Sequence, residues 1–145
     1  MREEYSAGGL ILTPNKNNWQ ILLMRDMNGV LTFPKGMIEK DEDPEDAARR
    51  EIREEVAIEN LQLLRHLSTI EYYYKRKGTV HKRVMYFLFL SKTRQKPRVQ
   101  RKEGITEARW MSFHDAISAV GYPETNRPLI QRARRWIARN TNRLL

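Results

Sequence analysis

Runs of apolar residues, separated by turn-forming residues, recur along the chain and predict β-strands. Two of the runs are long and are joined by a turn at 75–78, which is typical of a hairpin. A turn at 14–18 joins the first two strands, a loop follows at 26–29, and 92–104 is predicted to be an exposed loop. The predicted strands are 6–12, 20–25, 61–74, 80–90 and 107–111.

Three other segments repeat their apolar residues at helical spacing. In the first, which ends near residue 57, Asp43 is a good N-cap and Pro44 suits the first helical position. The other two predicted helices are 113–120 and 128–140. The order β-β-α-β-β-β-α-α predicts an α/β (α+β) fold, in which helices pack on a mixed sheet.

The length of 145 residues predicts a single domain, 1–145, with a substantial core. The chain has no cysteine, which excludes disulfides, thiolate catalysis and cysteine-based zinc sites. The longest apolar run, 84–90, is far shorter than a membrane span. Residues 1–9 lack the apolar core of a signal peptide. We therefore expect a soluble, cytoplasmic protein without a membrane partner.

The formal charge is +9, from 27 basic and 18 acidic residues, and it is unevenly distributed. Acidic residues gather in 33–58, and basic residues in two later stretches. Such fields attract anionic substrates and permit nonspecific contact with nucleic acid. In the C-terminal stretch we interpret the arginines as the solvent-exposed side of a docked helix. The basic residues of the two stretches are Lys92, Arg94, Lys96, Arg98, Arg101 and Lys102, then Arg127, Arg132, Arg134, Arg135, Arg139 and Arg143.

Glu51, Glu54 and Glu55 gather on one side of the first predicted helix. At 100° per residue they fall within an arc of about 100°, beside the apolar stripe. Like charges at this spacing destabilise a helix by about 0.2–0.5 kcal/mol per pair, a cost that a bound Mg²⁺ or Mn²⁺ would offset. The alternative is a solvated face whose glutamates are neutralised by the arginines at 49, 50 and 53.

The segment that contains these glutamates, residues 33–58, reads FPKGMIEKDEDPEDAARREIREEVAI. It resembles the Nudix box, G-x5-E-x7-R-E-U-x-E-E-x-G-U, in which U is a bulky aliphatic residue. The departure is Ala57, where the pattern has glycine. Helix ends of this kind are often left-handed, which costs a residue with a Cβ about 1 kcal/mol, unless the helix exits differently. The matching positions are Gly36, Glu42, Arg50, Glu51, Ile52, Glu54, Glu55 and Ile58.

The resemblance implies the α/β/α sandwich of the Nudix family and attack of water on a nucleoside-linked diphosphate. Mg²⁺ or Mn²⁺ would lower the pKa of a bound water and neutralise phosphate charge. Glu42 and Arg50 are expected to orient the metal-binding groups, and Arg50 to pair with Glu42. The implied metal ligands are the carbonyl of Gly36 and the carboxylates of Glu51, Glu54 and Glu55.

The general base has two sources in the family, a box glutamate, here Glu51 or Glu54, or a glutamate from a distant loop. Residues 102–110, KEGITEARW, resemble the family segment that precedes a tryptophan-containing strand. Relatives often place a glutamate about six residues before that tryptophan. Glu103 lies next to that position and is the candidate for a fourth ligand or base, against an ordinary loop residue. Glu107 is the weaker candidate.

Further segments resemble bacterial Nudix hydrolases of diadenosine tetraphosphate: YSAGGLIL, FPKG, and a tyrosine-rich strand followed by HKRVMYFLFL. The resemblance implies that Lys82 contacts the polyphosphate and that Tyr86 lies under a base. Strand alternation places both on one face, about 13 Å apart. Lys35 and Arg25 are further candidate phosphate contacts. The alternatives are a core role for Tyr86 and a solvated Lys82.

Two neighbouring features are interpreted as structural. His81 points to the face opposite Lys82, where a lone histidine is expected to be structural. Tyr72 and Tyr74 share a face and are predicted to pack under the C-terminal helix.

These features favour asymmetrical hydrolysis of diadenosine tetraphosphate to ATP and AMP. The alternatives are removal of pyrophosphate from 5′-triphosphorylated RNA, which the basic stretches favour, and hydrolysis of ordinary or oxidised nucleoside triphosphates. A different class, a Nudix module that binds nucleotides without turnover, is disfavoured by the intact glutamates. The partners expected are therefore a nucleotide or dinucleoside polyphosphate and RNA.

Overall fold

The computed structural model describes residues 1–144 and centres on a mixed, seven-stranded sheet. In the middle, β1 (Arg2–Asn15) runs parallel to β6 (Thr79–Leu90) and antiparallel to β2 (Asn18–Arg25). The strand order is β3-β2-β1-β6-β5, with β4 paired to β1 and β7 paired to β2. The remaining strands are β3 (Leu31–Thr32), β4 (Lys35–Met37), β5 (Gln62–Lys75) and β7 (Glu107–Ser112).

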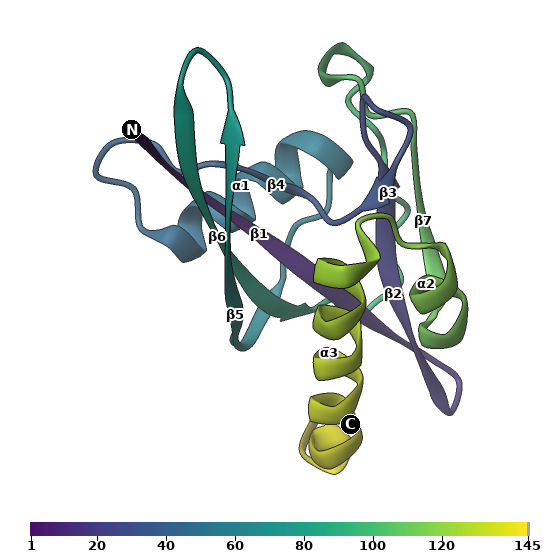
Figure 1. Ribbon diagram of the computed structural model, residues 1–145. Coiled ribbons are helices and arrows are strands. Elements are labelled where there is room, and N and C mark those ends of the chain that lie inside the picture. Colours follow the sequence, from purple (N-terminus) through teal and green to yellow (C-terminus); the bar gives the residue numbers. More distant parts are fainter. Residues whose placement is uncertain (145) are drawn as a thin grey trace.

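Helices cover both faces of this sheet (Figure 1). On one face, α1 (Pro44–Val56) packs on apolar side chains such as Ile11 and Phe89. On the other, α2 (Phe113–Ala119) and α3 (Pro123–Leu144) enclose a second core that includes Leu10 and Leu88. Alternate residues of β1 and β6 thus face opposite cores, as a strand requires. The predicted α/β/α sandwich on a mixed sheet is confirmed.

Most predicted elements are present, but β1 extends beyond both ends of the predicted strand and α3 ends four residues after the predicted helix. Three further differences have physical causes. The two short strands β3 and β4 were not predicted, because two or three residues are too few for a periodic pattern. The predicted exposed loop contains a short 3-10 helix, η1 (Arg101–Glu103). The prediction that the last helix begins at 128 is wrong: α3 begins at Pro123 and contains Pro128. The carbonyl of Tyr122 accepts hydrogen bonds from the first turn, and Pro128, which has no N–H, removes one helical bond, that to the carbonyl of Glu124.

Both ends of α1 agree with the predicted signals. Asp43 is the N-cap and its carbonyl accepts the N–H of Ala47 at 2.9 Å, although its side chain makes no capping bond. At the other end Ala57 is left-handed, with φ 59° and ψ 37°, and its N–H donates to the carbonyl of Arg53. The chain therefore leaves α1 through the conformation that glycine favours, in spite of the Cβ. In residues 1–144, no helix is both long and apolar enough to cross a membrane.

Candidate active site

The Glu51 carboxylate occupies the space that a side chain at Gly36 would need. Gly36 lies in β4, paired with Ala7 of β1, and Glu51 projects from α1 toward it. A Cβ added at Gly36 would lie 2.1 Å from the carboxyl carbon of Glu51 and 2.3 and 2.4 Å from its oxygens. Only glycine therefore lets the Glu51 carboxylate reach the backbone of β4. From the sequence, Gly36 was expected to act through its carbonyl, and no pattern in the chain predicted its closeness to Glu51.

Arg50, in the middle of α1, is the centre of an ion-pair network. Its guanidinium donates two hydrogen bonds to the Glu42 carboxylate, 2.9 and 3.0 Å long, so the predicted Arg50–Glu42 pair is present. It also donates to the carbonyl of Met37 at 2.9 Å, to Glu51 at 2.8 Å and to Glu54 at 3.4 Å. One cation thereby links the box loop to two of the predicted metal ligands.

The pKa values of the carboxylates at this place are shifted in opposite directions. The hydrogen bonds from Arg50, and then the one from the Glu39 N–H, lower the pKa of Glu42 to about 2. Burial raises the pKa of Glu55 to about 8, and the negative charges of Glu51 and Glu103 act in the same direction. Glu55 is 4% exposed, and its carboxylate accepts one hydrogen bond, 3.1 Å long, from the Lys35 N–H. Because a buried carboxylate with one donor is unfavourable, this position favours a nearby cation.

The pKa of Glu51 is also raised, first by burial, while Arg50 opposes the shift. Glu54 and Glu103 also contribute to the rise. Glu54 is the most open of the three predicted helix ligands, since its side chain is 43% exposed. The three helix glutamates therefore form a graded set, from the buried Glu55 to the partly exposed Glu54.

The segment 92–104 brings Glu103 to the same region. The N–H groups of Arg98 and Gln100 donate to the carbonyls of Val56 and Glu55, at 2.9 and 3.1 Å, and fix the segment to the end of α1. Glu103 follows in the exposed η1 turn, and its charge raises the pKa of both Glu51 and Glu55. Glu107 is engaged elsewhere, in ion pairs with Arg25 at 3.3 Å and Arg109 at 3.1 Å.

The donor set at this place fits a hard divalent cation. It offers carboxylate oxygens and a strand backbone, which are the ligands that Mg²⁺ and Mn²⁺ prefer. Within residues 1–144, however, no three acidic, histidine or cysteine side chains are yet arranged to hold a metal ion. Arg50 occupies oxygens of Glu51 and Glu54. Each of these carboxylates keeps a second oxygen that Arg50 does not bind, so Arg50 can hold both carboxylates in place while they bind a metal ion.

The three basic residues predicted to contact phosphate, Lys35, Lys82 and Arg25, lie in different surroundings. Lys35 lines a cavity beside the box. Lys82 lies on the same face of the sheet, with its Nζ 3.9 Å from Glu4, and burial followed by the charge of Lys35 lowers its pKa. Arg25 is held in the β2 end region, where it donates to the carbonyl of Gly29 at 2.8 Å and to Glu107.

His81 points to the opposite face of the sheet from Lys82, as predicted. It is 6% exposed, its Nδ1 lies 2.8 Å from a carboxylate oxygen of Glu3, and its ring stacks on Tyr73 with centroids 4.6 Å apart. These contacts fit the structural role expected for this histidine.

A cavity of about 450 Å³ lies on the α3 side of the sheet next to Lys35. Tyr86 forms part of its wall, but its ring is 1% exposed and packs edge-on against Phe33, with centroids 5.6 Å apart. This burial leaves no free ring face for a base, in agreement with the alternative core role. The exposed rings at the cavity are those of Tyr72, 39% exposed, and Tyr122, 53% exposed.

Tyr122 is a site residue that the sequence analysis missed. It lies immediately before α3, has a positive φ of 50°, and its carbonyl caps the helix. The available signal was the Tyr-Pro pair at 122–123. Proline is common at the first position of a helix, so the residue before it lies at the N-terminal end of that helix. Tyr72 was assigned to packing under the C-terminal helix, whereas it lines the cavity near the start of α3.

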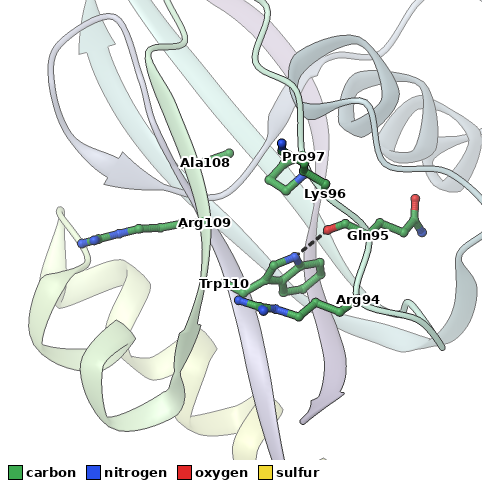
Figure 2. Close-up of a pocket in the computed structure, with 7 residues that line it drawn as sticks. All are labelled: Arg94, Gln95, Lys96, Pro97, Ala108, Arg109 and Trp110. Atoms are coloured by element: carbon green, nitrogen blue, oxygen red, sulfur yellow. Dashed lines mark hydrogen bonds between the residues drawn. The ribbon is translucent and has the colours of Figure 1, made fainter.

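A second cavity, of about 390 Å³, lies between the segment 94–97 and β7 (Figure 2). In this view the Trp110 indole points toward the segment, where its Nε1–H donates to the carbonyl of Gln95 at 2.8 Å, and the Arg109 side chain points away. None of the predicted site residues lines this cavity. The predicted site residues that line a cavity are Lys35 and Tyr86, both at the tyrosine-lined one, and Lys35 is next in sequence to Gly36 of the box.

Comparison with known proteins decides the family. Residues 4–133 match the sequence model of the NUDIX domain, which is most of the chain. The chain belongs to the Nudix family. It is a Nudix hydrolase, as the box glutamates and Arg50 indicated, and its departure at Ala57 leaves the fold of the family intact.

Solved structures of other Nudix proteins superpose on most of this Nudix chain. The complex of the Ap4A hydrolase from C. elegans is 25% identical, with a TM-score of 0.78 over 93% of this chain and 98% of that one. The dihydroneopterin triphosphate pyrophosphohydrolase of E. coli is 18% identical, with a TM-score of 0.73 over 90% and 96%. The NUDIX domain of Shewanella oneidensis NrtR, complexed with ADP ribose, is 18% identical, with a TM-score of 0.74 over 94% and 90%. The last two likenesses show the fold.

Proposed function

We propose that this Nudix hydrolase cleaves diadenosine tetraphosphate asymmetrically to ATP and AMP, with Mg²⁺ or Mn²⁺ as cofactor. The observation that carries the proposal is the cavity beside the box: Lys35 lies at its edge, and two exposed tyrosine rings line it. A polyphosphate chain needs cations, and a purine base needs a ring face. The likeness to the C. elegans Ap4A hydrolase supports the same substrate class.

The phosphate chain would run between the lysines and the box. Lys35 is placed by β4, whose backbone already binds Glu55, so its side chain leaves from the edge of the carboxylate cluster. The low exposure of Lys82, 14%, and its lowered pKa show a cation kept partly out of water. An anion beside it would restore the favourable environment of its charge, because opposite charges favour the ionised form.

The adenine base would lie against Tyr72 and Tyr122. Both rings are exposed at the cavity, whereas Tyr86 is closed off by Phe33. We therefore move the base-binding role from Tyr86 to these two tyrosines and retain Tyr86 as a wall of the cavity. Stacking of one base on one ring contributes about 1–3 kcal/mol.

The carboxylates would bind the metal and deprotonate water. Glu51, Glu54 and Glu55, with the carbonyl of Gly36, are the proposed metal ligands, and Glu42 with Arg50 would position them. When bound, the metal would lower the pKa of a water molecule and offset the phosphate charge. Glu54 and Glu103 are the candidates for the base, because both are partly or fully exposed and lie next to the buried acids.

The experiment is turnover with Mg²⁺ on diadenosine tetraphosphate, triphosphorylated RNA, and ordinary and oxidised nucleoside triphosphates, with products separated by ion exchange. Glu54→Gln is the inactive control and should lose turnover by orders of magnitude while it keeps the fold. ATP plus AMP, formed faster than any other product and lost in the control, is the expected result. Equal turnover by Glu54→Gln would refute the metal-site assignment. Faster release of pyrophosphate from RNA would assign the enzyme to RNA instead.

A further inference from the structure

Helix α3 carries a row of four exposed arginines, Arg132, Arg135, Arg139 and Arg143. Their spacing of three, four and four residues places them within an arc of about 80°, at 100° per residue. One guanidinium therefore follows another at nearly every helical turn, about 5.4 Å apart, over a length of about 16 Å. We call this set the arginine row.

The arginine row has no acidic counterpart. The sequence contains no aspartate or glutamate between residues 125 and 145. No ion pair to any of the four arginines is present in the part of the chain that the structure describes, whereas Arg50 pairs with glutamates of the box. A helix face that serves only solubility commonly mixes both signs of charge. All the cations of α3 are arginines, whose planar fork suits phosphate oxygens better than lysine does.

A basic amphipathic helix can also bind a membrane surface. That mode needs a free apolar face, but Leu129, Ile130, Ala133 and Ile137 of α3 are buried in the core of the domain. The far end of the helix is held as well, since the Trp19 indole N–H donates to the Thr141 hydroxyl at 3.3 Å. The arginine row can therefore offer charge and hydrogen bonds, and no apolar surface for lipid.

The row begins on the same helix that borders the tyrosine cavity. Tyr122, Thr125 and Asn126 line that cavity at the start of α3, and the row follows toward the C-terminal end (Figure 1). A ligand that combines a nucleoside polyphosphate with a longer row of phosphates would reach both. RNA made by a polymerase has this form, because its 5′ nucleoside triphosphate is followed by phosphodiesters.

We propose that the arginine row is a docking surface for the phosphodiester backbone of RNA whose 5′ end lies in the tyrosine cavity. This inference rests on the proposed function, since it takes that cavity as the nucleoside polyphosphate site. It deepens that function by naming RNA as a ligand of the enzyme. Contacts to the backbone carry no sequence information, so binding is expected to be independent of base sequence.

The test is the affinity of the full chain for a short, 3′-labelled single-stranded RNA without metal, measured by fluorescence anisotropy over a range of salt concentrations. Replacing all four arginines of the row by glutamine should lower the affinity roughly tenfold or more. It should also reduce the slope of log affinity against log salt by about 3, because each phosphate contact to a single strand contributes about 0.7. An unchanged affinity and slope would overturn the proposal.

Two matched variants separate the row from the general field. The four changes Arg→Lys at the same positions keep the charges and should keep the slope; a slope lost to the same degree would show damaged helix packing instead. The changes Arg94→Gln, Lys96→Gln, Arg98→Gln and Arg101→Gln remove as many charges from the other basic stretch. An equal loss of RNA affinity in that variant would indicate a diffuse field and overturn the proposal. The proposal would also be overturned if the four glutamine changes abolished binding to phosphatidylserine vesicles but left RNA binding unchanged.

Turnover of diadenosine tetraphosphate by the glutamine variant separates this inference from the proposed function. If wild type and variant both cleave it but bind RNA equally, the docking surface is refuted and the proposed function stands. If neither cleaves it while RNA affinity still depends on the row, the proposed function is refuted and the surface stands.

Discussion

The guanidinium of Arg50 holds the carboxylate of Glu42 by two hydrogen bonds, from Nε at 2.9 Å and from Nη2 at 3.0 Å. Glu42 lies in the loop after β4, and Arg50 lies on α1, so the pair fixes the loop on the helix. The same loop continues from Met37, whose carbonyl Arg50 also binds. A substitution of Glu42 should therefore lower the stability of the fold more directly than it lowers turnover.

Glu42→Gln should lower the free energy of unfolding at pH 7 and reduce its dependence on acid. The folded pKa of Glu42 is lowered to about 2 from an ordinary value of about 4.5. The stability that this group contributes is thus present above about pH 4.5 and is lost as the pH falls through 2. Urea midpoints of wild type and variant should differ most above pH 5 and converge toward pH 2. A difference that stays constant over this range would contradict the role given to the pair.

Gly36→Ala should displace the Glu51 carboxylate, because the new Cβ would lie 2.1 Å from its carboxyl carbon. Forced repacking of this kind costs about 1–3 kcal/mol in unfolding free energy. A shift of about 1 Å in a ligand can lower turnover by roughly a hundredfold. Turnover with Mg²⁺ and the urea midpoint measure the two effects.

The control for this change is the pair Gly36→Ala with Glu51→Ala. Removing the carboxylate removes the clash, so the two stability losses should be less than additive by more than about 0.5 kcal/mol. Activity should stay low in the double variant, since the proposed ligand is gone. Additive stability losses would mean that Gly36 is needed for a reason other than the approach of Glu51.

The local part of the site could be predicted from the sequence, and the long-range part could not. Glu51, Glu54 and Glu55 share one helix, so their spacing alone brings them together. The partner of Arg50 was also predictable, because Glu42 lies only eight residues away. Tyr72 and Tyr122 meet at one cavity through the packing of α3 on the sheet, which no periodicity in the chain encodes.

Two features that the sequence left open or misplaced have physical causes of the same kind. Strand alternation gave the face of Tyr86 but left open whether its ring is free or part of the core, because its burial depends on Phe33, a residue distant in the sequence. The last helix was predicted to begin at Pro128, whereas α3 begins five residues earlier at another proline, Pro123, and both prolines suit a first turn. Two prolines with the same local preference cannot be ranked without the capping contacts of Tyr122.

Tyr72→Leu should raise the KM for diadenosine tetraphosphate with a smaller effect on kcat. The loss of one stacked base, about 1–3 kcal/mol, corresponds to roughly a fivefold to hundredfold weaker binding. The matched control is Tyr73→Leu, because Tyr73 is the next residue of β5, is 63% exposed and stacks on His81 of the opposite face. Equal effects of the two changes on KM would remove Tyr72 from the base site. Steady-state kinetics with ATP and AMP as the quantified products gives both constants.

Ala57→Gly should stabilise the protein by about 0.5–1 kcal/mol and leave turnover unchanged. Ala57 ends α1 with φ 59° and ψ 37°, a conformation that costs a residue with a Cβ and is open to glycine. The unfolding free energy from urea titration measures the change. Ala138→Gly is the opposite control, since Ala138 is exposed inside α3, where glycine should cost about 1 kcal/mol. If both changes destabilise the chain, the left-handed end of α1 is not a source of strain.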